Sequence, residues 1–154
     1  MRLLFKILMV FSVFLAFAGV SVNAIAEPAI VTLTQVGCQF LESENDVDHG
    51  FVTEKQKDCE KINTKSGDKR LDESKIIKLT AGDYIFRVTN KNVPYPLGFW
   101  LRGDGLVNRA TLPSVSGGGL VTGKTLDYKI TLKPGEYVYS CPLNPTPDYK
   151  LVVN

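Results

Sequence analysis

The stretch Leu132-Lys-Pro-Gly-Glu-Tyr-Val-Tyr-Ser-Cys141 contains a turn between two apolar segments. Its Lys-Pro-Gly-Glu part is typical of a turn, and Tyr137–Cys141 is rich in the aromatic and β-branched residues that favour strands. Ahead of the turn, Leu126–Leu132 alternates apolar with polar residues, which indicates an antiparallel strand with one buried face. We therefore predict that these two segments form a β-hairpin.

Short strands and turns also recur in the rest of the chain. With the two segments above they make at least six short strands, which predicts an all-β sandwich or barrel with Greek-key connections. The further strands that we expect are Ile30–Val36, Ile76–Leu79, Tyr84–Thr89, Leu97–Leu101 and Tyr149–Val153.

Two stretches interrupt this pattern. Residues 41–75 are highly charged and too long for an ordinary loop, so we interpret them as an insertion. Within them, Thr53–Ile62 is expected to form a short helix capped by Thr53. The glycine run in Thr111–Leu120 predicts a surface loop or a close backbone approach. It lacks the spacing of a phosphate-binding motif.

The N-terminal residues 1–26 are typical of a secretory signal peptide. Arg2 and Lys6 precede an apolar run that ends in the small-residue site Ala24-Ile-Ala26, so we expect cleavage there and an exported domain spanning 27–154. The apolar run is short for a membrane span, so no stable membrane insertion is expected after cleavage. The full chain has 18 basic and 16 acidic residues, and this small excess lies in the leader, which argues against nucleic-acid binding.

The C-terminal segment resembles the last hairpin of a cupredoxin, in which a PGxYxYxC strand leads into a ligand loop and a closing strand. Ala81–Asn90 likewise resembles the strand that precedes the first copper ligand in that family. The resemblance implies a cupredoxin-like Greek-key β-sandwich from about Ile76 onwards, with residues 41–75 as a charged, partly helical insertion. It also implies that Cys141 occupies the position of the copper thiolate.

The histidines of a blue-copper site are missing from the positions that the resemblance indicates. Neither Lys91–Trp100 nor Pro142–Asp148 contains a histidine, and the latter has no methionine. A trigonal site of two histidines and one cysteine therefore cannot be assembled from this chain, whose single histidine is His49. The chain also resembles the cupredoxin-like domain of Efe-type periplasmic iron-uptake proteins, in which a first-strand cysteine pairs with the late-strand cysteine.

Three cysteines in an exported chain leave one unpaired. We favour a Cys38–Cys59 disulfide, which would pin the charged insertion and leave Cys141 as a free thiol. The alternative, Cys38 with Cys141, is the pairing that the Efe-type resemblance implies. Sequence alone leaves the pairings open, and Cys59–Cys141 is the least expected of the three.

Candidate metal ligands are Cys141, Cys38 and His49, with nearby carboxylates. His49 follows the acidic stretch Glu42–Asp48, which either supplies a cation-binding loop or simply faces water. Tyr95 and Trp100 lie in an aromatic segment beside the candidate site. They are candidates for a docking surface, although core packing is the commoner use of aromatic residues.

We therefore predict a periplasmic protein, or an extracellular one, that binds or transfers a copper or iron ion, with electron transfer as a second form of that role. Its partner would be the metal ion and a periplasmic redox or metal-uptake protein. The alternative is a metal-free module that keeps the fold for protein interaction, with Cys141 as a core thiol. The lone histidine has no nucleophile motif, so we do not expect an enzyme.

Overall fold

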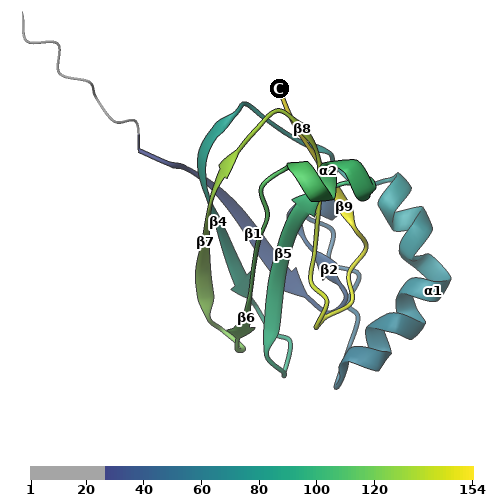
Figure 1. Ribbon diagram of the computed structural model, residues 1–154. Coiled ribbons are helices and arrows are strands. Elements are labelled where there is room, and N and C mark those ends of the chain that lie inside the picture. The colour runs from purple at the N-terminus through teal and green to yellow at the C-terminus, as the bar shows by residue number, and fades with distance from the viewer. Residues whose placement is uncertain (1–26) are drawn as a thin grey trace, which may run out of the picture.

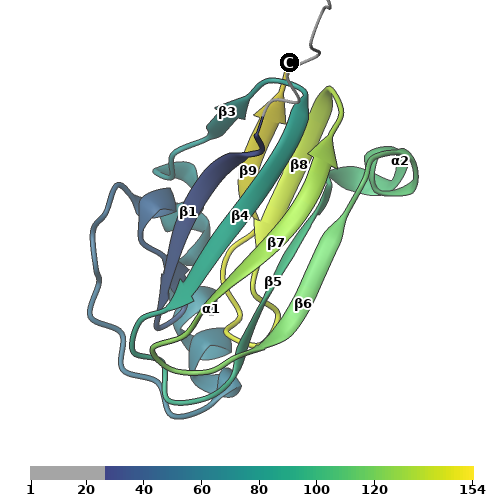
Figure 2. The ribbon, with the colours of Figure 1, turned by 90° about the vertical axis from the view of Figure 1, so that its left-hand side faces the viewer.

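The computed structural model describes residues 27–154, which form two packed β-sheets (Figures 1 and 2). One sheet has the order β2-β1-β4-β7 and the other has the order β3-β9-β8-β5-β6. The first consists of β1 (Ala29–Val36), β2 (Gln39–Phe40), β4 (Gly82–Asn90) and β7 (Thr125–Leu132). The second consists of β3 (Ile77–Leu79), β5 (Leu97–Gly103), β6 (Val115–Leu120), β8 (Gly135–Ser140) and β9 (Tyr149–Val153).

The predicted hairpin is wrong, because β7 and β8 belong to different sheets. β7 pairs antiparallel with β4, whereas β8 lies between β5 and β9. Gly135 has a φ of 152° and Gly82 a φ of 150°, a backbone conformation that side-chain-bearing residues rarely adopt. At both glycines the chain passes from one sheet to the other, since β3 and β4 also lie in different sheets. The two turns are therefore corners of the sandwich.

The core lies between the two sheets and is rich in aromatic rings. The Phe99 ring is stacked on Phe86 with centroids 5.6 Å apart, and it also packs on Tyr128 and Tyr139. These side chains come from β4, β5, β7 and β8, so the cluster joins both sheets. The predicted burial of alternate residues in β7 is confirmed from Tyr128 onwards, whereas Leu126 at the start of the strand is exposed.

The insertion contains a 3-10 turn, η1 (Glu42–Glu44), and a helix longer than expected, α1 (Gln56–Asp72), which lies along the outside of the sandwich (Figure 1). Thr53 does not cap the helix as predicted. The cap position is Lys55, and the Asp58 carboxylate accepts the backbone N–H groups of Glu54 and Lys55, both at 3.0 Å. Thr53 is instead buried, where its hydroxyl accepts a hydrogen bond from the Tyr95 hydroxyl.

The glycine run is a strand, β6, and not the predicted loop. It pairs with β5, and a second unpredicted element, the helix α2 (Gly105–Thr111), precedes it. The predicted close approach is present at Gly117, where an added Cβ would lie 2.8 Å from the Tyr128 ring. No helix of the described residues 27–154 is long and apolar enough to span a membrane, and the predicted signal peptide lies outside that range.

Candidate functional site

Cys141 directly follows β8, at the start of the loop 142–148, and its side chain is fully buried. The Gly98 backbone N–H donates to its sulfur at 3.3 Å. The backbone N–H groups of Leu143 and Asn144 and the Gln35 side chain lie close enough to the sulfur to lower the pKa of its thiol. Burial raises the pKa of the Cys141 thiol, although all these donors oppose the shift. The residue is therefore a neutral thiol enclosed by the core at ordinary pH.

Cys38 and Cys59 form a disulfide with a Cα–Cα distance of 5.0 Å, which confirms the pairing that we favoured. The Cys38–Cys141 pairing is excluded, and Cys141 is the free thiol of the described residues. Cys38 follows β1 and Cys59 lies in the first half of α1, so the bond fixes the insertion to the first sheet. In this state neither sulfur is a thiolate that could share a metal with Cys141.

Asn144 links these two parts of the site. Its side-chain N–H donates to the Val36 carbonyl at 2.9 Å, and its Oδ1 accepts the Cys38 backbone N–H at 3.0 Å. Oδ1 also lies 3.1 Å from the Cys59 sulfur. Asn144 was not foreseen from the sequence, because an asparagine in a proline-rich loop is typical of an exposed turn. Its complete burial depends on segments far away in the sequence.

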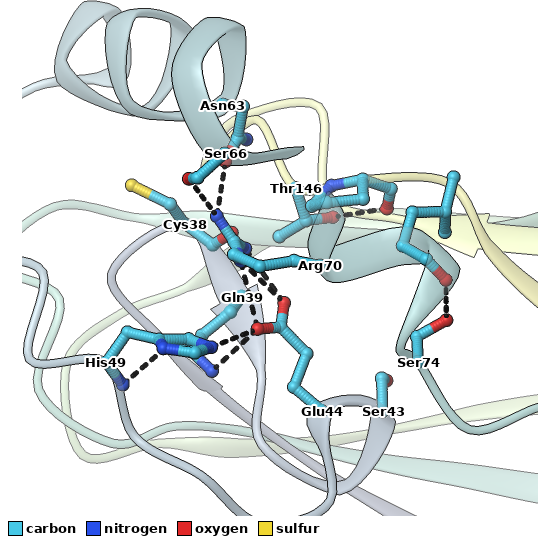
Figure 3. A network of polar contacts seen from close by, with 12 residues as sticks. Cys38, Gln39, Ser43, Glu44, His49, Asn63, Ser66, Arg70, Ser74 and Thr146 are labelled. Atoms are coloured by element: carbon cyan, nitrogen blue, oxygen red, sulfur yellow. Dashed lines mark hydrogen bonds and ion pairs between the residues drawn. The ribbon is translucent and has the colours of Figure 1, made fainter. Parts of the chain in front are cut away.

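His49 lies in a separate network around Glu44, shown in Figure 3. Its Nε2 is 2.7 Å from a Glu44 carboxylate oxygen, and its ring stacks on Phe51. The Arg70 guanidinium contacts both oxygens of Glu44 and donates to the Cys38 carbonyl at 2.9 Å. The acidic stretch is therefore not simply solvated, since Glu44 is buried as the centre of an ion pair.

The surroundings of Glu44 keep it ionised. Burial alone would raise its pKa, but hydrogen bonds from Arg70 and Tyr149 and the nearby Arg70 charge outweigh burial, so the pKa lies below its usual value. The Tyr149 hydroxyl donates to the same carboxylate, and burial raises the pKa of that phenol well above its usual value. With Arg70 filling one side of the carboxylate, this network is organised as a buried ion pair.

The groups around Cys141 do not fit a type 1 copper centre. The sulfur is surrounded by N–H donors, while the buried polar side chain of the following loop is the Asn144 amide, already bonded to backbone. Within residues 27–154, no group of three or more His, Cys, Asp or Glu residues is placed to hold a metal ion. The three metal ligands predicted from the sequence are therefore not brought together. Cys141 is a buried free thiol, Cys38 is in the disulfide, and His49 contacts Glu44.

Trp100 lies on the outer face of its sheet, opposite the buried Phe99, because adjacent residues of a strand point to opposite faces. The Arg102 guanidinium stacks over its ring at 4.0 Å, and the Arg109 guanidinium lies at 5.7 Å. A groove of about 380 Å³ runs beside it, with Trp100, three residues of β6 and the start of the loop after Cys141 in its lining. Tyr95 is half-buried and bonded to Thr53, and it does not line this groove.

Comparisons with solved structures identify the type of fold. No protein-family model and no curated protein matches the chain. Among solved structures, auracyanin B is similar at a TM-score of 0.51 and 14% identity, over 84% of this chain and 91% of that one. Auracyanin A, a "blue" copper protein from Chloroflexus aurantiacus, has a TM-score of 0.46 and 17% identity, over 83% of this chain and 100% of that one. An oxidised amicyanin mutant has a TM-score of 0.42 and 14% identity, over 85% of this chain and 87% of that one. Two mixed sheets, a late-strand cysteine and the likeness to auracyanin B give the described residues a cupredoxin-like fold.

Proposed function

We propose that this protein is an exported, metal-free binding module of cupredoxin-like fold, which recognises an extended peptide segment in the groove beside Trp100. The observation that carries the proposal is the contrast between the enclosed surroundings of Cys141 and the open groove next to them. The thiol of Cys141 is enclosed by backbone donors, and the amide of Asn144 is fully engaged. The groove, only a few residues away along the same loop, is open at Pro142 and Leu143.

The groove has the chemistry of a site for an extended chain. β6 is the last strand of its sheet, so one of its edges pairs with no strand of the described residues. Such an edge can add a further strand through main-chain hydrogen bonds. Gly118 places no side chain over the floor, and Trp100 and Leu143 supply apolar walls. These features support an apolar peptide side chain seated between the two walls.

Charge supports one further property of the peptide. Arg109 is exposed beside the Trp100 ring and forms no ion pair within residues 27–154, whereas Arg102 is already paired with Asp148. An acidic residue next to the apolar anchor would meet the Arg109 guanidinium. The proposed ligand is therefore an extended segment with an apolar residue followed or preceded by a carboxylate.

Selection from a random linear peptide library on immobilised protein tests this function. Selected peptides should bind with the proposed pattern and should lose affinity about thirtyfold or more in Trp100→Ala, since a central aromatic anchor contributes about 2 kcal/mol or more. Gly118→Val is a second variant, because its added Cβ meets only ordinary van der Waals contacts while filling the groove. Val52→Ala, an exposed position outside the groove, is the control. A selection without binders, or binding that neither groove variant weakens, would contradict the proposal.

The second candidate function is metal binding, and one observation favours it. The N–H donors that converge on the Cys141 sulfur would also stabilise a thiolate, as a soft copper or iron ion requires. In this version Cys141 binds or passes on the ion, or transfers an electron, and the partner is a periplasmic redox or metal-uptake protein. Near-stoichiometric copper or iron in protein purified from the periplasm, lost in Cys141→Ser, would replace the first proposal with this one.

A further inference from the structure

The helix α1 lies across the loop that follows Cys141. The Gln56 side chain donates to the Pro142 carbonyl at 2.8 Å, and the Asn63 side chain donates to the Pro145 carbonyl. Between these two positions, the Cys59 sulfur lies 3.1 Å from Oδ1 of Asn144. The first half of α1 therefore covers the loop that directly follows Cys141.

Few apolar contacts hold this helix in place. Of its 17 residues only Cys59, Gly67 and Arg70 are buried, and Arg70 is held by its ion pair with Glu44 near the other end of the helix. Such a polar helix gains little from burial and opens more readily than the core strands. The first half of α1 is therefore held chiefly by the disulfide and by two side-chain hydrogen bonds to the loop.

The residues around the disulfide can also satisfy the two cysteines when they are reduced to thiols. In the oxidised protein the Cys59 sulfur carries no proton, so its contact with Asn144 is not a hydrogen bond. After reduction, the S–H group of Cys59 would donate a hydrogen bond to Oδ1 of Asn144. Cys38 has a φ of 62°, a conformation that a non-glycine residue keeps only where its surroundings hold it. Hydrogen bonds of the Cys38 backbone with Asn144 and Arg70 hold this conformation, and they do not require the disulfide.

We infer that the Cys38–Cys59 disulfide is a reversible latch on α1, and that its reduction by a dithiol opens the loop and makes Cys141 a site for thiol modification. A dithiol thiolate attacks one disulfide sulfur, the bond between Cys38 and Cys59 breaks, and the leaving thiolate takes a proton. The second thiol of the reductant, as its thiolate, then attacks the reductant sulfur of the mixed disulfide, and the remaining protein cysteine leaves as a thiolate and takes a proton. The protein thereby gains two thiols and the reductant becomes a disulfide. Without the latch, α1 leaves the loop and Cys141 becomes accessible to disulfides and other electrophiles.

A buried polar atom near the Cys141 sulfur also indicates that the surroundings of this thiol have a role beyond core packing. Oε1 of Gln35 has no hydrogen-bond partner, although the side chain is fully buried and its amide N–H donates to the Gly98 carbonyl at 2.8 Å. The same side chain lies beside the Cys141 sulfur, where it lowers the pKa of the thiol. Oε1 of Gln35 therefore remains available to an O–H or N–H group of a modifying molecule that reaches Cys141.

Alkylation of Cys141 tests the latch. Native protein in the oxidised state, and protein reduced with dithiothreitol and then freed of it without oxygen, are treated with iodoacetamide, and the modification of Cys141 is followed by mass spectrometry. We expect Cys141 to react about tenfold faster or more after reduction, since the opening of α1 replaces global unfolding as the route to the thiol. Near-ultraviolet circular dichroism monitors whether the core stays folded.

The double variant Cys38→Ser with Cys59→Ser separates the latch from other effects of the reductant. Its Cys141 should react at the fast rate without any reduction, and amide hydrogen exchange should be faster in α1 while the core strands stay protected. Equal alkylation rates in oxidised and reduced protein would overturn the inference. Complete loss of the near-ultraviolet signal on reduction would overturn it as well, because the disulfide would then serve only the stability of the whole domain.

Discussion

The sandwich and its insertion are held together in different ways. The two sheets enclose a continuous apolar core in which Phe99 contacts aromatic rings from both sheets. The insertion contains a buried ion pair of its own, and it is attached to the sandwich by one disulfide and by single side-chain hydrogen bonds, such as those from Arg70 to the Cys38 carbonyl and from Gln56 to the Pro142 carbonyl. Apolar packing is spread over many contacts, whereas each attachment of the insertion is a single group. Changes in the core should therefore affect the whole domain, and changes in the insertion should act locally.

Phe99→Ala should have the largest effect. Its ring is buried between both sheets, and removing a buried aromatic ring costs about 3–5 kcal/mol through lost burial and the cavity left behind. Urea unfolding followed by circular dichroism measures the loss. The matched control is Val52→Ala, an exposed position whose change should leave the midpoint almost unchanged. A loss below 1 kcal/mol in Phe99→Ala would mean that the core tolerates the cavity.

Arg70→Ala should come next, at about 3 kcal/mol, because it leaves the buried Glu44 carboxylate without its counter-charge. Urea unfolding reports the loss, and hydrogen exchange should place the increased opening in η1 and α1. The control is Arg87→Ala, which breaks the exposed pair with Asp127 and should change little. Similar losses for the two arginine variants would remove the distinction between the buried and the exposed pair.

Loss of the disulfide should cost a similar or slightly smaller amount. For the 21-residue separation of Cys38 and Cys59, the entropy of the unfolded chain predicts about 3 kcal/mol. The double serine variant and the reduced protein should show the same unfolding midpoint, and in both the loss should add to that of Phe99→Ala. A strongly non-additive result would show that the insertion and the core are one cooperative unit.

The smallest expected effect is a pH dependence. The pKa of Glu44 is lower in the folded protein than its ordinary value of 4.5, so its ion pair contributes fully above that value. Stability should fall as the pH drops from about 4.5 through the folded pKa, because protonation removes the charge that Arg70 and Tyr149 bind. Urea midpoints between pH 6 and 3 should fall less steeply in Glu44→Gln. Parallel curves would assign the acid sensitivity to other carboxylates.

Much of the fold could be predicted from the sequence, but not how its strands are combined. The alternation in Leu126–Leu132 shows which side chains are buried, yet it contains no information on which sheet the next strand joins. The corners at Gly82 and Gly135 look like ordinary turns in sequence, and only the pairing of the strands on either side shows that the chain changes sheet there. The likeness to known motifs therefore gave the correct fold class despite the wrong hairpin.

The candidate site was predicted in part. The Cys38–Cys59 pairing was the favoured one of the alternatives that the sequence left open, and the structure confirms it. Asn144 and Gln35 were not foreseen, because their burial is produced by strands and loops distant in sequence. The pairing of Glu44 with Arg70 was missed for the same reason, as 26 residues separate them. Whether Cys141 binds a metal, as the retained cysteine led us to predict, remains a prediction.

A copper titration of residues 27–154 tests most directly that Cys141 is a core thiol and not a metal ligand. Copper(II) is added to the oxidised protein, and the visible spectrum is recorded alongside that of Cys141→Ser. We predict identical spectra for the two proteins, without an intense thiolate-to-copper absorption band, because the sulfur is enclosed by the core and its backbone donors. A stoichiometric band in the wild-type protein that disappears in Cys141→Ser would contradict the account.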